Sequence, residues 1–599
     1  MGGHKGRVAA GPRAVDPQGP TPPRIAGPGA AFPTIWGRSS PGGPRLPRVD
    51  SVEIAGPGQP SVPEPVTAQP QSIRPGLLVP LTVALVSFAV YLRTLMPGVA
   101  FGDWGEMATV PHVLGVAHPT GYPTYILMAW LAELVPVGSV AFRANLLSAL
   151  YVTVTLATLS LISLRLGVRP VLAIAGALAM GAVGTVWAAA TVSEVNPLHL
   201  MFVALIIQRA LIWADRRTRF DLILGGLLIG LALGNHLLML FVAPFVALFV
   251  LWAGRRELLA RPWLLLLAAA AVVLGLSVYL YIPLAALGSP PLPYNHPTTL
   301  DGVIWLVTGT QFRGQFDFLA VKGPGDFVAA LPALWALLVA RATVVLPALG
   351  ALGLVRLVWR RPAFGLMCVG IMVTGLYIWA NYLQLEHYLL VPWLIVAIGL
   401  TTGLEGLAQA LGLALGQITE RGGAGPNRAA GAEGGRFAWA GHVSTGLIGA
   451  AGLVFVVILG SLNWSTADLS NDHSGTTYIN AVFSALPRDA AILSYWDASS
   501  PLWYGQHVDG LRPDILIVDD TNIVYENWGT REARIAALIC SRPVFILRLD
   551  GRDLIPTRAA YNLVPFLMVS VAAGGPSAVA SVEIYQVEPI DPGTCPGSG

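Results

Sequence analysis

Charged residues are scarce in this sequence. Asp, Glu, Lys and Arg together account for 12% of its 599 residues, whereas a soluble globular domain carries about 25%. Hydrophobic residues account for 54%, and a water-soluble protein of this length needs more charge to cover its surface. The composition therefore excludes a purely soluble protein and is typical of a helical protein that crosses the lipid bilayer several times.

Cysteine and net charge are low as well. Three cysteines exclude a disulfide-rich scaffold. The formal net charge is only +3, and no basic face with interleaved aromatic residues occurs. We therefore expect no nucleic-acid partner.

The first 74 residues lack any apolar run. They are rich in Pro, Gly and Arg, and such a segment cannot bury enough surface to fold, so residues 1–74 are predicted to be a disordered cytoplasmic tail. The segment also lacks the early hydrophobic stretch of a cleavable signal peptide. The first apolar run, 77–97, is therefore predicted to be a signal-anchor that stays in place.

Long apolar runs follow, each close to the ~20 residues that a membrane-spanning helix needs. One run, 220–253, is interrupted by Gly234-Asn235-His236 and is interpreted as two short spans of about 15 residues that turn at this break. The segment 121–137 contains Pro123, Glu133 and Pro136 and is interpreted as a helix lying in the membrane interface. The other predicted spans are 77–97, 145–164, 170–189, 197–213, 263–284, 342–359, 363–381, 387–411 and 443–463.

The positions of the arginines indicate the orientation. Clusters of Arg follow alternate spans, and cytoplasmic loops carry the excess of basic residues. This bias selects about eleven transmembrane helices in a multi-pass cell-membrane protein, with the N-terminus in the cytoplasm and the C-terminus outside. Residues 75–464 are then the membrane domain, with a first outer loop at 98–144.

The tail 465–599 has a different pattern. Short apolar segments at 491–495, 514–518, 542–547 and 582–585 are predicted strands, and 500–508 is a predicted helix. Strands that alternate with helices favour a small α/β domain outside the cytoplasm. The predicted fold class is thus an all-α polytopic membrane protein with a small extracytoplasmic C-terminal α/β domain.

Polar residues that the membrane spans do not need collect on the predicted outer face. Ionisable groups at membrane depth are costly and usually mark a functional site, so we predict that these residues share one outer pocket. They are Asp103, Glu106, His112, His118, Glu194, Asn196, His199, Asn235, His236, the loop 285–328 with Arg313, Asn381, Glu386 and His387.

Asp103 and Glu106 are three residues apart, so on a helix they share one face. A carboxylate at the mouth of a partly dry cavity can act as a general base. The same spacing is close to a capping box, which only satisfies backbone donors at a helix start. The two interpretations are compatible. Neither these residues nor His112 and His118 form a pair with the i, i+4 spacing of a zinc helix, so a divalent metal is not favoured.

The segment His118-Pro119-Thr120-Gly121-Tyr122-Pro123 predicts a rigid loop, because proline restricts the residue before it. His118 and Tyr122 either present hydrogen-bond donors to a ligand or merely flank a chain break. The sequence leaves both open.

Several further residues have two interpretations each. Arg143 and Arg313 lie on the predicted outer face, where an arginine either binds a phosphate or lies along the lipid headgroups. Glu194 at a span boundary is either solvated or part of the pocket. Asn235 and His236 more strongly indicate a cavity lining, because polar residues within an apolar run are tolerated there.

Together these motifs resemble a known family. The segments that carry the resemblance are Gly102-Asp103-Trp104-Gly105-Glu106, Leu114 to Pro123, Phe142 to Ala149 with Arg143 and Asn145, Trp187 to Val195, Gly234 to Leu237, Trp503 to Gln506 and Arg512 to Asp514. Across roughly 77–520 the chain resembles the protein O-mannosyltransferase-like integral membrane family of the GT-C glycosyltransferase superfamily.

The resemblance implies a polytopic glycosyltransferase with its active site on the non-cytoplasmic face and a polyprenyl-phosphate-linked sugar as donor. An acidic residue of the first outer loop serves as base in that superfamily, and Asp103 matches its position, with Glu106 as a second catalytic candidate. Thr120 and Asn196 depart from the family pattern, which commonly has proline and tyrosine there. The residues expected to bind the donor or substrate are His118, Tyr122, Arg143, Asn145, Glu194, His199, Asn235, His236, Arg313 and His387.

The expected reaction transfers the sugar, mannose in one branch of the family, to a hydroxyl of a protein or glycan acceptor with inversion. A sugar outside the cell cannot come from a cytosolic nucleotide donor, and phosphate is a good leaving group, so we expect no required cofactor. The main alternative is a polytopic transporter or flippase of a lipid-linked or polar substrate. The polar residues gather toward one face and no internal repeat occurs, which favours the enzyme.

Overall fold

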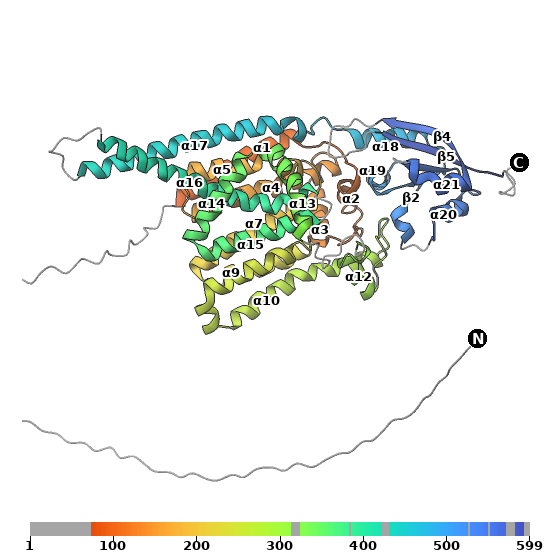
Figure 1. Ribbon diagram of the computed structural model, residues 1–599. Coiled ribbons are helices and arrows are strands. Elements are labelled where there is room, and N and C mark those ends of the chain that lie inside the picture. The colour runs from red at the N-terminus through yellow and green to blue at the C-terminus, as the bar shows by residue number, and fades with distance from the viewer. Residues whose placement is uncertain are drawn as a thin grey trace, which may run out of the picture. The chain divides into compact units, whose positions relative to one another are not determined.

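The protein was analysed as a computed structural model, which describes residues 73–312, 324–381, 385–421, 431–524, 528–548, 551–570 and 581–591 (Figure 1). Apart from residues 73 and 74, the predicted N-terminal tail lies outside the described residues, as does Arg313.

The described residues between 73 and 467 are mainly helical, as the long apolar runs predicted. The helices of this membrane domain are α1 (Ile73–Thr94), α2 (Gly102–Thr109), α3 (Pro123–Glu133), α4 (Val140–Arg165), α5 (Pro170–Gly181), α6 (Gly184–Ala190), α7 (Val195–Arg216), α8 (Arg219–Leu233), α9 (Met239–Ala260), α10 (Trp263–Leu276), α11 (Tyr281–Leu287), α12 (Leu300–Val307), α13 (Pro324–Ala342), α14 (Val345–Arg360), α15 (Pro362–Asn381), α16 (Leu390–Arg421) and α17 (Gly431–Ala467), with short 3-10 turns at Ser277–Leu280, Thr310–Phe312 and Glu386–Leu389.

The number of candidate spans is smaller than the eleven predicted. Within the described residues, eight helices are long and apolar enough to cross a membrane, or up to ten if each of two bent pairs counts as one span. The difference arises at α8, because its 15 residues fall short of the ~20 that a bilayer requires. Helix α3, predicted to lie in the interface, is only 11 residues long.

Two predicted spans are bent. The segment predicted at 170–189 consists of α5 and α6, which meet at 73°. The segment predicted at 342–359 is α14, and it turns by 106° from α13. The break predicted at Gly234-Asn235-His236 separates α8 from α9. Hydropathy detects apolar length but not the direction of the axis, so the bends could not be predicted.

Acidic and basic residues occupy opposite ends of the same helices. Helix α7 begins after Glu194 and ends at Arg216, and α4 ends at Arg165. A cavity of about 480 Å³ at the arginine end is lined by Arg356, Arg360 and other residues. Arginine-rich ends favour the cytoplasmic side, and this orientation remains a prediction.

Residues 474–589 form the small α/β domain, which the sequence predicted with four strands. The structure has five, in the order β2-β1-β3-β5-β4, with β2, β1 and β3 parallel and β5 antiparallel to β3 and β4. The elements are α18 (Ser474–Ala485), β1 (Ala491–Ser494), α19 (Trp496–His507), β2 (Leu516–Asp519), α20 (Arg531–Leu538), β3 (Val544–Arg548), α21 (Ile555–Ala560), β4 (Tyr561–Ser570) and β5 (Ser581–Pro589), with 3-10 turns at Asp520–Val524 and Gly551–Leu554.

Strand β4 was missed by the sequence analysis. It contains Pro565, and its register against β5 shifts between Pro565 and Leu567. Proline within a run argues against a strand except at an edge or a bulge, and β4 has both features. Pro565 therefore interrupted the apolar–polar alternation that predicts a strand, in the middle of β4.

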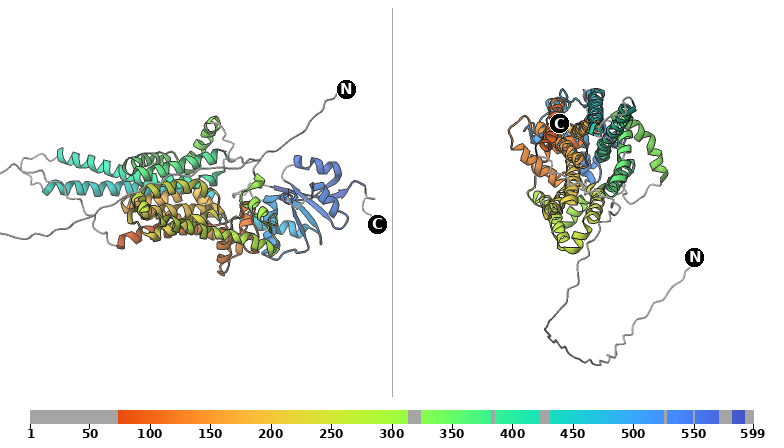
Figure 2. Two further views of the ribbon diagram at one scale, coloured as in Figure 1. Left: turned by 90° about the horizontal axis from the view of Figure 1, so that it is seen from below. Right: turned by 90° about the vertical axis from the view of Figure 1, so that its left-hand side faces the viewer.

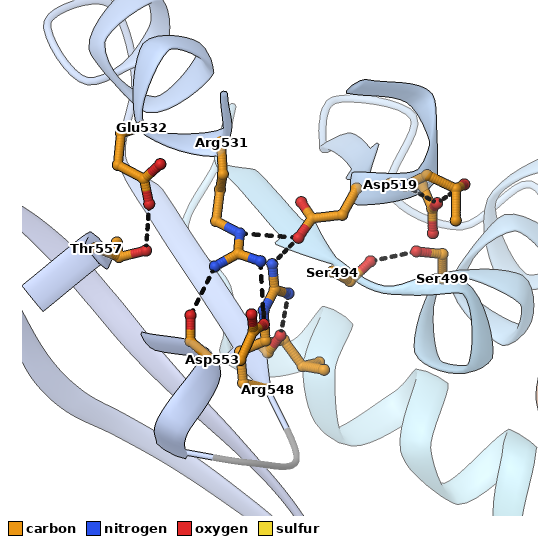
Figure 3. Close-up of polar contacts among 11 residues, drawn as sticks. Ser494, Ser499, Asp519, Arg531, Glu532, Arg548, Asp553 and Thr557 are labelled. Carbon is orange, nitrogen blue, oxygen red and sulfur yellow. Dashed lines mark hydrogen bonds and ion pairs between the residues drawn. The ribbon is translucent and has the colours of Figure 1, made fainter. Parts of the chain in front are cut away.

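Four charged residues tie β3, α20 and two 3-10 turns together (Figure 3). Arg531 lies 2.8 Å from Asp520 and 3.0 Å from Asp553. Arg548, whose side chain is 3% exposed, lies 2.8 Å from Asp553 and also pairs with Asp520. Two positive and two negative groups thus compensate one another at the edge of the domain core.

The α/β domain packs on the first outer loop of the membrane domain through α2 and α19 (Figures 1 and 2). The backbone N–H of Ala141 donates to the Tyr504 hydroxyl at 3.1 Å. A Cβ atom at Gly105 would lie 2.7 Å from the hydroxyl oxygen of Ser500. This close approach requires glycine and sets α2 directly against α19.

Candidate functional site

Helix α2 places Asp103 and Glu106 at the start of the first outer loop. Its N-cap is Phe101, in an extended conformation and without a side-chain cap. Asp103 lies inside the first turn, and no capping box forms. The capping interpretation of this pair is therefore wrong, and the two carboxylates are available for other contacts.

Glu106 binds both the backbone and the ring of His118. The Glu106 side chain is 2% exposed, and its Oε1 accepts a hydrogen bond from the backbone N–H of His118 at 2.8 Å. Its Oε2 bonds to Nδ1 of the same histidine. The Pro119-to-Pro123 turn that the sequence predicted to be rigid brings His118 back over α2. Glu106 thus orients the histidine ring from a buried position.

Tyr122 fixes the proton on the other ring nitrogen. The Tyr122 hydroxyl donates to the carbonyl oxygen of Pro119 at 3.0 Å, and it lies 3.1 Å from Nε2 of His118. A hydroxyl has a single hydrogen to donate, so the tyrosine accepts from Nε2–H. With Nδ1–H directed at Glu106, this arrangement favours the imidazolium form.

The charges agree with that assignment. Burial lowers the pKa of His118, but the carboxylates of Glu106 and Asp103 outweigh burial and raise it to about 9. A positively charged His118 compensates one of the two neighbouring carboxylates at neutral pH.

Asp103 is the solvent-exposed carboxylate of the pair. Its side chain is 56% exposed, and Oδ2 lies 3.8 Å from Nε2 of His118. The other oxygen accepts a hydrogen bond from the indole N–H of Trp496 at 2.7 Å. Trp496 is the first residue of α19, so both domains orient this carboxylate. It retains free acceptor positions for a further group.

Asp103, Glu106 and His118 offer ligand atoms that all lie within 4.8 Å of one another. A divalent cation held by these three would neutralise the carboxylates and polarise an oxygen of a bound substrate. The sequence argument against a metal relied on spacing along one helix. It could not predict that the loop folds back and brings His118 close to α2. The charged His118 supplies the same compensation without a metal.

Glu194 and Asn145 connect the site to the helices. Glu194 caps α7 by accepting from the backbone N–H of Val195 at 3.0 Å, and its other oxygen accepts from the indole N–H of Trp104 at 2.9 Å. The Asn145 amide donates to the carbonyl of Met96 at 2.8 Å and accepts from the backbone of Ser193 at 2.7 Å. Both residues position the loops around α2.

Arg143 lies in the first turn of α4. Its guanidinium donates to the carbonyl of Val135 at 2.8 Å. It lines none of the four described cavities. The sequence could not show that the preceding loop uses one of its donors, and its role in binding phosphate remains a prediction.

A line of histidines runs from this cluster into the helices. The His236 ring lies 6.0 Å from Tyr122 and 5.7 Å from His199. Within the described residues, both ring nitrogens of His199 and the side-chain oxygen of Asn235 are buried without a hydrogen-bond partner. Buried polar atoms of this kind call for a bound group or water.

Beside α2, a cavity of about 480 Å³ opens among the helices. Arg341 on α13 reaches it and holds Glu386 at 2.8 Å. Arg341 was not among the predicted site residues, because nothing in its local sequence separates it from an arginine at a helix end. The cavity lining includes Trp104, Thr185, Glu194, Arg341, Glu386 and His387.

A second cavity, of about 380 Å³, lies between the first outer loop and the α/β domain. Its wall includes Glu106 of α2 and Trp496, which contacts Asp103. Helix α2 therefore contributes Trp104 to the helical cavity and Glu106 to this outer cavity. Sequence reasoning did not select Trp496, whose role depends on the packing of α19 against α2.

Residues 103–259 match the family model described as the Protein O-mannosyl-transferase TMEM260 N-terminal domain. The chain is 32% identical over 224 residues to the mouse (Mus musculus) Protein O-mannosyl-transferase TMEM260, which is 36% of this chain and 32% of the relative. It is 36% identical over 64 residues, 10% of this chain and 8% of the relative, to a Dictyostelium discoideum protein of the same name. The chain thus spans about a third of the mouse relative's length.

The fold is similar to that of a solved membrane protein. The crystal structure of ArnT from Cupriavidus metallidurans, bound to undecaprenyl phosphate, aligns with a TM-score of 0.50 and 13% identity, covering 85% of this chain and 97% of that one. The fold class, a polytopic helical domain with a small C-terminal sheet, is confirmed. The resemblance seen in the sequence is confirmed over the matched residues, which include Asp103, Glu106 and His118.

Proposed function

We propose that this chain is a membrane glycosyltransferase that moves a sugar from a polyprenyl-phosphate donor to an acceptor hydroxyl, with Asp103 as the base. The observation that carries the proposal is the place of Asp103. It is an oriented but exposed carboxylate on α2, the helix that lines both the helical cavity and the outer cavity. The name of the mouse relative and the lipid phosphate bound to ArnT support the same reaction class.

The helical cavity suits the donor. A polyprenyl chain needs a groove among apolar helices, and its phosphate needs a cation. Arg341 supplies a fixed guanidinium at the cavity wall, and His387 lies in the same lining. Arginine binds phosphate oxygens readily, so we assign to Arg341 the phosphate-binding role expected of Arg143 and Arg313.

The reaction is a single displacement. The acceptor oxygen bonds to the anomeric carbon, the bond from that carbon to the phosphate oxygen breaks, and polyprenyl phosphate leaves with the bonding electrons. Asp103 takes the hydroxyl proton. Attack from the side opposite the leaving group inverts the anomeric configuration. The acceptor enters from the outer cavity and meets the donor sugar beside Asp103.

His118 and Glu106 support this base. The imidazolium of His118 lies 3.8 Å from the Asp103 carboxylate and attracts it, and Trp496 fixes one carboxylate oxygen. Glu106 is buried against His118 and acts through it. We therefore propose Glu106 as a positioning residue, in place of the catalytic role expected from the sequence.

Mannose as the sugar and a protein as the acceptor are the finer part of the proposal, supported by the name of the mouse relative. The positive-inside bias supports an extracytoplasmic location for this site, with the N-terminus in the cytoplasm. No cofactor is required, because phosphate is a good leaving group and His118 compensates the local charge.

The test is transfer of radiolabelled sugar by the purified full chain from polyprenyl-phosphate mannose to a serine- or threonine-containing peptide. Labelled product is the expected result, and heat-inactivated protein is the control. In proteoliposomes, movement of the labelled lipid to the opposite leaflet without any product would overturn the proposal and favour a flippase.

A further inference from the structure

We propose that the acceptor is an extended polypeptide segment that binds by adding a strand to the outer edge of β2, with its hydroxyl directed toward Asp103. This inference rests on the proposed transfer reaction and adds the acceptor-binding site. The outer cavity between the first outer loop and the α/β domain is where that edge lies.

The cavity wall shows that β2 presents its edge. Four consecutive residues, 515–518, line the cavity. Successive side chains of a strand point to opposite faces, so a cavity over one face touches alternate residues only. Contact with every residue in turn means that the cavity runs along the backbone edge.

The backbone of that edge is directed outward. The N–H of Leu516 donates to the carbonyl of Ala490 at 2.9 Å, toward β1. In a parallel pair the alternate residue points its N–H and C=O the other way, so those of Ile517 face the cavity. Among the described strands, β2 pairs with β1 alone. An added strand would satisfy these groups, as in other peptide-binding sheets.

The cavity borders the catalytic cluster. Glu106 and Trp496 form part of its wall, and the indole nitrogen of Trp496 lies 2.7 Å from Asp103. A peptide along β2 therefore has the exposed carboxylate next to the Trp496 wall. The far wall is the loop 291–294, whose Pro293 forms an isolated bridge with Val116.

The remaining lining suits a polypeptide more than a lipid. Gln506, His507 and Arg534 supply polar groups, and the Arg534 guanidinium stacks 4.5 Å from the Trp528 ring. The Gln506 amide donates to the carbonyl of Ile515 at 2.8 Å, which fixes the start of the strand. A lipid acceptor would require a continuous apolar wall, which these polar groups interrupt. The alternative occupant that the experiments must distinguish from a polypeptide is a glycan that stacks on the tryptophans.

The first experiment changes the edge. Ile517→Pro removes the outward N–H while leaving the bonds to β1, because proline is tolerated at the solvent side of an edge strand. We expect the KM for a ten-residue threonine peptide to rise about tenfold with kcat unchanged. Transfer to a single blocked threonine, too short to pair with β2, is expected to stay the same. Ile517→Ala is the matched control and retains the N–H.

The second experiment changes the peptide and needs no substitution. Binding of a fluorescent threonine peptide to the purified full chain is measured by anisotropy. We expect N-methylation of alternate amides on one edge of the peptide to weaken binding about tenfold, with no effect on the other edge. Equal effects of both methylation patterns would overturn the inference.

Evidence that the cavity binds a glycan acceptor would also overturn the inference. In that case the KM for the glycan acceptor would rise in Trp528→Ala and would stay the same in Ile517→Pro. Failure of the transfer reaction itself is distinguishable, because the peptide would still bind in the anisotropy measurement with the edge-specific pattern.

Discussion

Asp103 and Asp553 are equally open to solvent but have opposite surroundings. Their side chains are 56% and 52% exposed. Asp553 Oδ2 lies 3.0 Å from Arg531 and 2.8 Å from Arg548, so two guanidinium groups share this oxygen. Asp103 has an indole N–H at 2.7 Å and a histidine at 3.8 Å. Exposure alone does not make a base, and a carboxylate needs acceptor positions that no cation has taken.

The two clusters also differ in their charge balance. Arg531, Arg548, Asp520 and Asp553 compensate one another. Asp103 and Glu106 share one histidine. The first arrangement stabilises a fold, whereas the second leaves one negative group for chemistry.

The largest expected effect comes from Asp103→Asn. Loss of the general base should lower sugar transfer by about 10²- to 10⁴-fold, while the free energy of unfolding changes by no more than about 0.5 kcal/mol because the side chain is exposed. Transfer of radiolabelled sugar and thermal unfolding of the detergent-purified chain measure the two. Asp553→Asn is the matched control and should retain transfer while lowering stability by about 1 kcal/mol. Near-normal transfer by Asp103→Asn would reject its role.

Arg548→Met should have the next largest effect, now on stability. The substitution removes the buried guanidinium, so the two aspartates keep only Arg531. Breaking a buried ion pair lowers the free energy of unfolding by about 3–5 kcal/mol. Limited proteolysis of the full chain, followed at the α/β domain, measures the loss. Asp520→Asn in the same chain should restore part of the stability. An unchanged proteolysis rate would show that the cluster is not compensated as described.

Trp496→Phe should have a smaller effect on catalysis. It removes one hydrogen bond to the Asp103 carboxylate, and such a bond to a charged group contributes about 1.5–3 kcal/mol. We expect kcat to fall about tenfold. Because the indole holds one carboxylate oxygen in place, its loss should lower kcat while leaving the KM for the donor unchanged. The exposed Trp439, changed to Phe, is the control. A higher KM for the donor with an unchanged kcat would contradict the positioning role of Trp496.

Removal of divalent metal should have the smallest effect. The charged His118 already compensates the carboxylates, so dialysis against EDTA is expected to leave sugar transfer unchanged. The measurement is the initial rate before and after dialysis and after return of Mg²⁺ or Mn²⁺. Loss of transfer that a metal restores would instead assign a cation to Asp103, Glu106 and His118.

Much of the helical architecture could be predicted, because apolar length and charged ends are local properties. The break at Gly234-Asn235-His236 is an example, since a glycine and two polar residues interrupt an apolar run. Arg341 and Thr343 interrupt the apolar sequence near the junction of α13 and α14 in the same way, but the 106° angle of that bend is set by packing. Strand β4 was hidden by Pro565, whose tolerance depends on where the strand lies in the sheet.

The candidate site was predictable in part for the same reason. Asp103, Glu106, His118 and Tyr122 lie within 20 residues of one another, so a short loop brings them together. Arg341 and Trp496 lie far along the chain, and their relation to α2 exists only after the helices and the α/β domain have packed. Arg143, predicted in the first outer loop, lies in the first turn of α4, and one of its donors is bound to the carbonyl of Val135.

The sequence by itself determined that this chain is a polytopic membrane protein with acidic and histidine residues in its first outer loop, because hydropathy and the cost of buried charge act on each segment separately. The tertiary structure decided which carboxylate stays free, which arginine reaches the helical cavity and which strand edge faces the site. These depend on distances between residues hundreds of positions apart, and only packing sets such distances.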